Sequence, residues 1–287
     1  MTNNSNTMSP KFLFDIGGTR TRLALSPGND TVGGIESFDT AKEFGDQLLA
    51  LKDAALKLAG GNIEGGISGG LPGVLNQGKT TLRTSPHLPK WVGVDIKGSL
   101  CKLFGGPVEL ENDAALAALG EAYRGAGKGY RIVAYVGIGT GVGGARIVDG
   151  NIDERYIGFE PGHQIIDSDG ALHSEAGKVG NEMRLEELVS GSAFEKRFGK
   201  HPREITYEAV WDEAARMVAV GLHNTIVHWS PEVVVLGGSM FKTPGISIDR
   251  VRDYLKKYLT IHPELPELKH AELGEESALY GALAISV

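Results

Sequence analysis

The chain has 287 residues, a length that allows one large α/β unit or two lobes. Hydrophobic residues make up 41% of it and charged residues 23%, so it can bury a substantial core. A formal net charge of -7 without a basic stripe argues against a nucleic-acid partner. A single cysteine, Cys101, excludes an intramolecular disulfide framework and a cysteine-rich zinc site.

The residues before Lys11 are polar, and we expect them to form a tail ahead of the first strand. They contain no apolar segment of the kind that a signal peptide needs. No apolar run approaches the roughly 20 residues of a membrane span. These features predict a cytoplasmic protein without a membrane partner.

The first part of the chain predicts strands and helices in alternation. Thr40 is the candidate N-cap of the first helix, which runs to the glycines at 60–61. The expected strands cover 12–17, 22–26, 31–38, 63–71 and 107–113, and two further helices cover 94–106 and 114–127.

A second cycle of elements starts at Tyr130 with a continuous apolar strand over 130–139. The chain returns as a hairpin around Asp149 and Gly150, and the region 155–200 is irregular and then helical. A long helix over 206–229, a buried strand over 231–239, an amphipathic helix over 246–259 and a final apolar helix over 276–287 follow.

A strand, a glycine-rich turn with Gly-Thr and a second strand occur twice, over 12–25 and over 132–148. This is a weak internal repeat. It predicts two similar α/β lobes that face each other across a cleft, where small ligands bind.

The two glycine-rich turns are candidate phosphate loops. In DIGGT, Asp15 lies inside an apolar strand, where an unpaired carboxylate is costly, and this favours a functional loop over a plain hairpin. The second loop, 136–144, is by itself equally consistent with a glycine hairpin. As a pair, the loops could grip the β- and γ-phosphates of a nucleotide.

GVLNQGKT, over 73–80, matches the P-loop pattern in form only. A true P-loop opens a helix, and here Pro86 and Pro89 follow instead. We interpret Asn76 to Gly78 as a hairpin turn.

Three further motifs each allow a structural and a functional interpretation. Asp113 follows a strand and precedes a helix, so it could be an N-cap or a general base. Glu160 and His163 flank Pro-Gly and could be structural or could bind one ligand. Gly237 and Gly238 end an apolar strand, either at an ordinary connection or at a nucleotide site.

Together and in this order, the motifs resemble the ROK family of sugar kinases, within the actin and hexokinase superfamily. The resemblance covers nearly the whole chain and is carried by DIGGT, LENDAALAALGE, GIGTGVGGARIVDG, EPGH, LEELVSG and VVLGGS. It implies an α/β, two-lobed actin-like/hexokinase (RNase H-like) fold with an interdomain cleft. Residues 1–112 plus 275–287 would form a small N-terminal lobe, and 113–274 a large C-terminal lobe.

The resemblance also implies an ATP-dependent sugar kinase that phosphorylates a hexose hydroxyl with Asp113 as the catalytic base. It places at the sugar Asn112, Asp113, Glu160, His163, Glu186, Gly70 and His87. It places at ATP and its phosphates Asp15, Gly17, Gly18, Thr19, Arg20, Gly139, Thr140, Gly141, Gly237 and Gly238. The implied cofactors are ATP and Mg²⁺, with Asp15 reaching the metal through water.

This sequence departs from the family pattern at two places. The family often carries a zinc motif of one histidine and three cysteines, and no cysteine lies between His163 and Glu186, so we expect no zinc. His87 stands where many relatives have asparagine, which bears on the identity of the sugar.

The resemblance implies glucose or a related aldohexose, phosphorylated at the 6-position, and a homodimer. An N-acetylhexosamine, N-acetylmannosamine or N-acetylglucosamine, is the alternative substrate, and polyphosphate an alternative donor. A sugar-sensing regulator is less favoured, because about ten residues ahead of the first strand are too few for a helix-turn-helix domain.

Overall fold

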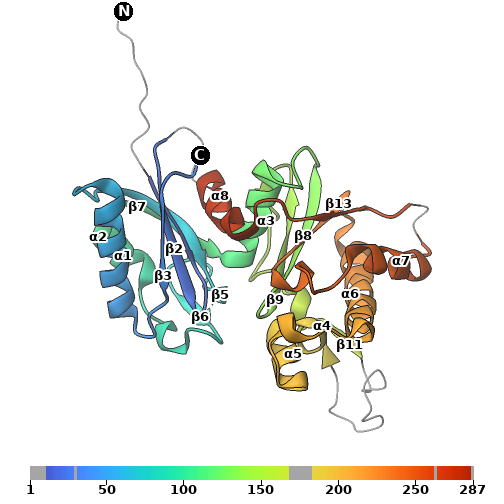
Figure 1. Cartoon of the computed structure of the whole chain (residues 1–287). Helices are drawn as coiled ribbons and strands as arrows, with labels where there is room; N and C mark the ends of the chain where they lie inside the picture. The colour runs from blue at the N-terminus through green and yellow to red at the C-terminus, as the bar shows by residue number, and fades with distance from the viewer. Residues whose placement is uncertain (1–10, 29–30, 168–182, 262–263, 286–287) are drawn as a thin grey trace, which may run out of the picture. The chain divides into compact units, whose positions relative to one another are not determined.

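The computed structural model of the chain describes residues 11–28, 31–167, 183–261 and 264–285. Contacts divide these residues into two compact units (Figure 1). The first unit comprises the described residues of 1–123, Glu154–Gly158 and 275–287. The second comprises those of Arg124–Asp153 and Phe159–Gly274. In these ranges no helix is both long and apolar enough to cross a membrane.

The first unit is built on a five-stranded sheet in the order β3-β2-β1-β4-β7. The three strands β1, β2 and β3 are antiparallel neighbours, whereas β4 and β7 continue the sheet parallel to β1. Their bounds are β1 Lys11–Ile16, β2 Arg20–Ser26, β3 Ile35–Asp39, β4 Gly65–Leu71 and β7 Gly105–Asn112.

Helices cover both faces of this sheet, because successive strand residues point to opposite sides. Phe12 and Phe14 pack with helices α1 (Phe44–Ala59) and α2 (Ile96–Phe104). Leu13, between them in sequence, packs with α3 (Asp113–Arg124) and α8 (Ser277–Ala284). Strand β1 is therefore buried on both faces, as its apolar sequence requires.

Helix α3 belongs to the first unit rather than to the second. Its Leu116 packs with Leu13 and Leu279, and Ser277 of α8 donates a hydrogen bond to its Glu121 at 3.1 Å. The compact units therefore divide after Tyr123, later than the expected lobe boundary at Asn112. Residues Glu154–Gly158 also group with the first unit, although the chain on both sides of them belongs to the second.

The second unit repeats this sheet. Its order is β10-β9-β8-β13-β14, again with three antiparallel strands followed by two parallel ones. The bounds are β8 Ile132–Ile138, β9 Val142–Val148, β10 Asn151–Ile152, β13 Val233–Gly237 and β14 Glu267–His270. The internal repeat predicted from the sequence is therefore confirmed at the level of sheet topology.

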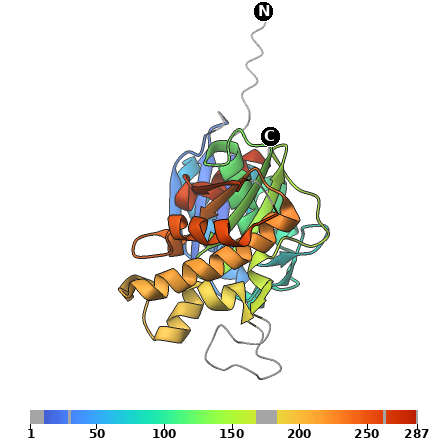
Figure 2. The same ribbon diagram turned by 90° about the vertical axis from the view of Figure 1, so that its right-hand side faces the viewer.

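Helices α6 (Glu208–Trp229) and α7 (Ile248–Tyr258) pack on the second sheet, and Figure 2 views the unit from their side. Shorter helices α4 (Leu185–Val189) and α5 (Gly191–Phe198) complete the cover. Two small sheets pair β5 (Val74–Leu75) with β6 (Leu82–Thr84) and β11 (Ile165–Asp167) with β12 (Met183–Arg184). The described 3₁₀ turns are Pro89–Trp91, Pro161–His163, Pro202–Glu204, Ser239–Phe241 and Gly274–Glu276.

Two sequence predictions about helix starts have different outcomes. Thr40 as N-cap is wrong: α1 starts at Phe44 after Glu43, because the Thr40 hydroxyl is used elsewhere, as a donor to the Gly17 carbonyl at 2.9 Å. The rejection of a P-loop at 73–80 is confirmed, since Asn76 to Gly78 lie in the turn between β5 and β6 and no helix starts there.

Candidate functional site

The first glycine turn, Gly17 to Thr19, joins β1 to β2 in a tight hairpin. The Gly17 amide donates to the Arg20 carbonyl at 2.8 Å and closes the turn. Gln47 donates to Thr21 at 2.9 Å, and Thr21 shares a 2.9 Å hydrogen bond with Thr40, which donates to the Gly17 carbonyl. Since Gly17 accepts at the end of this chain, buried hydroxyls fix the conformation of the turn.

Asp15 lies one residue before the end of β1, beside Arg22 of β2. One Asp15 carboxylate oxygen is 3.4 Å from the Arg22 guanidinium, which also pairs with Glu275. Burial raises the pKa of Asp15 to about 6, although Arg22 lowers it in part. Such a carboxyl can exchange a proton near neutral pH, which is typical of functional groups.

His87 and Arg20 lie near the first turn in different ways. A Cβ added to Gly18 would come within 2.7 Å of the His87 Cβ, so the absence of a side chain lets the exposed His87 lie against the turn. Arg20 is turned toward β3, where its guanidinium bonds Asp39 at 2.9 Å and Ser37 at 3.1 Å. Of these two side chains, that of His87 lies against the turn and that of Arg20 does not.

Asn112 and Asp113 stand at the junction of β7 and α3. The Asn112 side chain is the cap, since its carbonyl oxygen accepts the Ala115 amide at 3.0 Å. Its nitrogen donates to the Gly73 carbonyl at 3.1 Å. Asp113 is the first helical residue, and its carboxylate accepts the Ala114 amide at 2.8 Å. A substitution at Asp113 would therefore leave the helix cap in place.

Gly70 makes room for this junction. A Cβ on Gly70 would lie 3.0 Å from the Cα of Asp113, tighter than ordinary contacts allow. Gly70 and Asp113 are thus direct neighbours at the ends of adjacent strands β4 and β7. This is the carboxyl edge of the parallel strands, where open α/β sheets bind ligands.

Glu111, buried directly before Asn112, was not predicted as a site residue from the sequence. Its carboxylate accepts hydrogen bonds from Lys79 at 2.7 Å, from Arg155 at 2.5 Å and from the Asn112 amide at 2.8 Å. Burial alone would raise the pKa of Glu111, but the bonds from Arg155 and Lys79 hold it below its usual value. The available signal was a glutamate in a strand, directly after the apolar Leu110; its partners lie far away in sequence.

The second glycine turn, Gly139 to Gly141, joins β8 to β9. The Gly139 amide bonds the Gly141 carbonyl at 2.9 Å and closes the turn. The amides of Gly191 and Ser192, at the start of α5, donate to the carbonyls of Gly139 at 2.7 Å and Thr140 at 3.2 Å. Backbone amides of α5 therefore hold the carbonyls of the second turn.

Glu186 of α4 is attached to the same turn. Its carboxylate accepts the Val142 amide at 2.6 Å. A Cβ on Gly141 would lie 2.6 Å from that carboxylate, so only glycine leaves room for Glu186 at this place. The predicted sugar-binding glutamate thus contacts the predicted phosphate loop.

Glu160 precedes the 3₁₀ turn Pro161–His163 and His163 is its last residue; both are exposed. Neighbouring protein removes water from around Glu160 and raises its pKa; His163 opposes this rise and Glu186 adds to it. The Leu185 amide donates to the Gln164 carbonyl at 3.0 Å, which joins the residue before Glu186 to the residue after His163. The structure therefore gathers the three predicted sugar-binding residues of the second unit.

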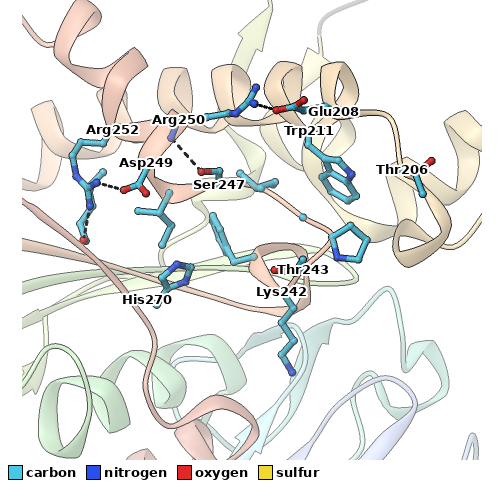
Figure 3. Close-up of a pocket in the computed structure, with 16 residues that line it drawn as sticks. Thr206, Glu208, Trp211, Lys242, Thr243, Ser247, Asp249, Arg250, Arg252 and His270 are labelled. Carbon is cyan, nitrogen blue, oxygen red and sulfur yellow. Dashed lines mark hydrogen bonds and ion pairs between the residues drawn. The ribbon is translucent and has the colours of Figure 1, made fainter.

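Gly237 ends β13 and Gly238 follows it, next to the second turn, since a Cβ on Gly139 would lie 3.9 Å from the Ser239 hydroxyl. Beyond them a pocket of about 560 Å³ opens (Figure 3). Trp211, Phe241 and Pro244 give it apolar surfaces. The other lining residues are Thr206, Glu208, Lys242, Thr243, Gly245, Ile246, Ser247, Ile248, Asp249, Arg250, Arg252, Leu268 and His270.

Among the residues that the structure describes, no group of three histidine, cysteine or acidic side chains is suited to a metal ion. The interval between His163 and Glu186, on which the zinc expectation rests, lies in large part outside those residues, at 168–182. The absence of zinc stays a prediction.

Comparison with known proteins agrees with this architecture. A glucokinase of Thermotoga maritima is 25% identical over 311 residues, covering 94% of this chain and 95% of the relative. An N-acetyl-D-glucosamine kinase of Yersinia pseudotuberculosis is 28% identical over 300 residues, covering 94% and 96%. A solved ROK family glucokinase from Streptomyces griseus, in complex with glucose and AMPPNP, matches with a TM-score of 0.78 and 23% identity, covering 96% of this chain and 99% of that one.

The fold is thus the two-domain, actin-like/hexokinase α/β fold, and the expectation from the sequence is confirmed. The model of the ROK family matches residues 13–287, nearly the whole chain. The chain belongs to the ROK family.

Proposed function

We propose that this protein is a sugar kinase that transfers the γ-phosphoryl group of ATP to a hexose hydroxyl, with Asp113 as the general base. The observation that carries the proposal is the carboxylate of Asp113 at a helix start whose cap is supplied by its neighbour Asn112. Asp113 is therefore not needed as the cap. Membership of the ROK family, in which relatives bear the names of glucose and N-acetylglucosamine kinases, supports the same reaction.

In the proposed step, the sugar hydroxyl gives its proton to the Asp113 carboxylate while its oxygen bonds to the γ-phosphorus. The bond from that phosphorus to the bridging oxygen breaks, and ADP leaves. Asn112 holds a neighbouring hydroxyl and so orients the reacting one. Gly70 and His87 complete the sugar contacts of the first unit in this proposal.

Glu160, His163 and Glu186 supply the second unit's contacts to the sugar. They combine carboxylate acceptors with an imidazole, the mixture that sugar hydroxyls require. Desolvation by neighbouring protein is the main cause of the raised pKa of Glu160; His163 opposes the rise, and the nearby Glu186 carboxyl adds to it.

The two glycine turns hold the phosphates of ATP through backbone amides and through the hydroxyls of Thr19 and Thr140. ATP enters with Mg²⁺, which neutralises phosphate charge during transfer. Asp15 fits a role at that ion, because carboxylate oxygens are its preferred protein ligands. Its bond to Arg22 favours contact through water.

The nucleoside end of ATP would enter the pocket beyond Gly237 and Gly238. Trp211 and Phe241 offer aromatic surfaces for the base, and its volume of about 560 Å³ is in the range of small-ligand sites. Thr206, Ser247 and Lys242 lie around it with groups that can bond a ribose or a base edge (Figure 3).

We propose glucose or a related aldohexose, phosphorylated at its 6-hydroxyl, as the substrate. An N-acetylhexosamine is the second candidate, favoured by the N-acetyl-D-glucosamine kinases among the relatives. His87, beside the first turn, is the residue through which we expect the choice to be made.

An ATP-consumption assay over glucose, mannose, N-acetylglucosamine and N-acetylmannosamine tests the proposal. We expect turnover that requires Mg²⁺ and one of these sugars, and a phosphate on the 6-hydroxyl of the product. Polyphosphate in place of ATP tests the donor. Sugar binding by calorimetry without any turnover would refute the kinase and favour a sugar-sensing regulator.

A further inference from the structure

A group of three charged side chains, centred on the buried Glu111, adjoins the predicted base, and none of them has a part in the proposed chemistry. Glu111 has only 6% of its side chain exposed. One carboxylate oxygen, Oε2, accepts hydrogen bonds from the Lys79 ammonium at 2.7 Å and from the Arg155 guanidinium at 2.5 Å. The other, Oε1, accepts the backbone amide of Asn112 at 2.8 Å. Since a buried carboxylate without partners is very costly, the two cations are what keep Glu111 ionised in this position.

Lys79 is held in place by the turn between β5 and β6. The Asn76 side chain accepts the Thr80 amide at 2.7 Å, and the Lys79 amide donates to the Asn76 carbonyl at 2.9 Å. Lys79 itself has a φ of 49°, a left-handed conformation that few non-glycine residues adopt. The turn therefore accepts local strain in the conformation that presents Lys79 to Glu111.

The same hairpin contacts the junction a second time. The Gly73 carbonyl, just before β5, accepts the Asn112 side-chain nitrogen at 3.1 Å. Asn112 is thus fixed through its backbone by Glu111 and through its side chain by Gly73. Because Asp113 follows directly, both bonds determine where the Asp113 carboxylate lies.

Arg155 brings a distant part of the chain to the same carboxylate. It lies in Glu154–Gly158, the short segment that groups with the first unit while its flanks belong to the second. Its side chain is only 15% exposed. Its bond to Glu111 therefore fixes the segment Glu154–Gly158 to the first unit.

We propose that Lys79, Glu111 and Arg155 are positioning residues, which hold Asn112 and Asp113 in the geometry that catalysis needs. This inference rests on the proposed kinase function. In this proposal the GVLNQGKT segment does not bind phosphate. Its lysine, Lys79, helps to position the base Asp113 through Glu111. Small displacements of a catalytic group are costly, so positioning residues affect turnover more than binding of a distant substrate.

The cleanest variant is Lys79→Met, because Lys79 is 45% exposed and its loss leaves Glu111 paired with Arg155. Arg155→Met removes the other cation and leaves Lys79. The matched control is Lys97→Met. Lys97 pairs at 3.9 Å with Glu109, which lies on the same strand as Glu111 but is exposed. Lys79→Arg keeps the charge and a donor.

We expect Lys79→Met and Arg155→Met each to lower kcat by about 10- to 100-fold, the effect of a displaced catalytic group. The KM for ATP should stay near the wild-type value. Amide hydrogen exchange should rise at Asn112 to Ala115, which reports the junction whether or not the protein is a kinase. Lys97→Met should change neither kcat nor the hydrogen exchange at 112–115. Lys79→Arg should recover most of the turnover.

The inference is overturned if folded Lys79→Met and Arg155→Met match Lys97→Met in hydrogen exchange at 112–115. It is equally overturned if they keep wild-type kcat. A wild-type protein without activity on any sugar would instead remove the kinase proposal, and the exchange comparison would still decide whether these residues fix the junction.

Discussion

The two glycine turns follow equivalent strands in sheets of the same order, yet they are held in different ways. In the first turn the Gly17 carbonyl is held by a side chain, since the Thr40 hydroxyl donates to it at 2.9 Å, and the Thr40 amide donates to the Thr19 carbonyl at 2.9 Å. In the second, the Gly191 amide donates to the Gly139 carbonyl at 2.7 Å. The two units therefore share the position of the turn in the sheet, but different groups hold the turn in each unit.

The turns also differ in where a carboxylate comes from. In the first sheet it is Asp15, on the strand itself, one residue before the strand ends. The equivalent place in β8 is Gly137, and the carboxylate beside the second turn is Glu186, from helix α4. Asp15 is paired with an arginine and Glu186 with a backbone amide. This asymmetry suits a reaction in which the two turns have different duties.

The largest expected effect tests whether the first unit supplies the base. Asp113→Asn should lower kcat by about 10²–10⁴-fold, the usual contribution of a positioned base. The free energy of unfolding should change by at most about 1 kcal/mol, because Asn112 caps the helix and an asparagine at position 113 can accept the same hydrogen bond from the Ala114 amide. Turnover and thermal melting of one protein preparation measure both.

Asp95→Asn is the matched control for this variant. Asp95 caps α2 in the same unit by accepting the Gly98 amide at 2.9 Å, and it has no proposed part in the reaction. Its substitution should leave kcat unchanged. If Asp113→Asn behaved in the same way, Asp113 would be a structural residue only.

The next effect concerns the second turn. Glu186→Ala removes the acceptor of the Val142 amide and a predicted sugar ligand together, so we expect the KM values for sugar and ATP to rise together. Hydrogen bonds to charged groups contribute about 1.5–3 kcal/mol, which corresponds to roughly 10- to 100-fold. Steady-state kinetics with each substrate varied measures the two constants.

Glu195→Ala, on the exposed side of α5, is the control for that prediction and should change neither constant. A rise in the sugar KM alone would show that Glu186 does not support the turn. The two glycine turns would then differ less than their hydrogen bonds indicate.

The third prediction uses the charge that distinguishes the first turn. Because burial raises the pKa of Asp15 to about 6, above the ordinary 3.8, ionisation of Asp15 disfavours the folded state. This cost is fully present above pH 6 and disappears as the pH falls below the unfolded pKa. Asp15→Asn should therefore stabilise the protein by on the order of 1 to 3 kcal/mol at pH 8, and not at pH 4.

Denaturant unfolding at both pH values checks the sign. Arg22 keeps Glu275 as a partner in the variant, so no cation is left unpaired by the change. Asp39→Asn is the control, since Asp39 is exposed and its loss should give no such pH-dependent gain. Activity of Asp15→Asn should fall although stability rises, and equal stability at both pH values would contradict the assigned pKa.

Most of the fold could be predicted because its signals are local. Apolar strands that end in glycine turns, and the Asp149-Gly150 hairpin, depend on neighbouring residues, and the structure has them where the sequence predicts them. The duplicated sheet followed from the repeated strand-turn-strand pattern. The start of α1 was misplaced because Thr40, a good cap by type, bonds a residue that is 23 positions away in sequence.

The residue types of the candidate site could be predicted from the sequence, but the contacts that hold those residues in place could not. Glu111 illustrates the limit: its partners Lys79 and Arg155 lie 32 and 44 positions away, so only the folded sheet brings them together. The bond from Val142 to Glu186 also spans 44 positions. Motifs show which groups a reaction can use, whereas the contacts that hold those groups depend on tertiary packing.

The smallest effect is the most direct test of how the turns are held. Thr40→Val keeps the shape of the side chain but removes the hydroxyl between Thr21 and the Gly17 carbonyl. We expect a loss of about 1 kcal/mol in the free energy of unfolding, the usual net value of one hydrogen bond.

The second turn offers the matched variant Thr140→Val, in which the exposed hydroxyl is lost but the bond from the Ser192 amide to the Thr140 carbonyl remains. Thr140→Val should leave the melting temperature unchanged and raise only the KM for ATP. Equal melting temperatures for the two variants would mean that the Thr40 hydroxyl does not support the first turn, and the contrast between side-chain and backbone support would fail.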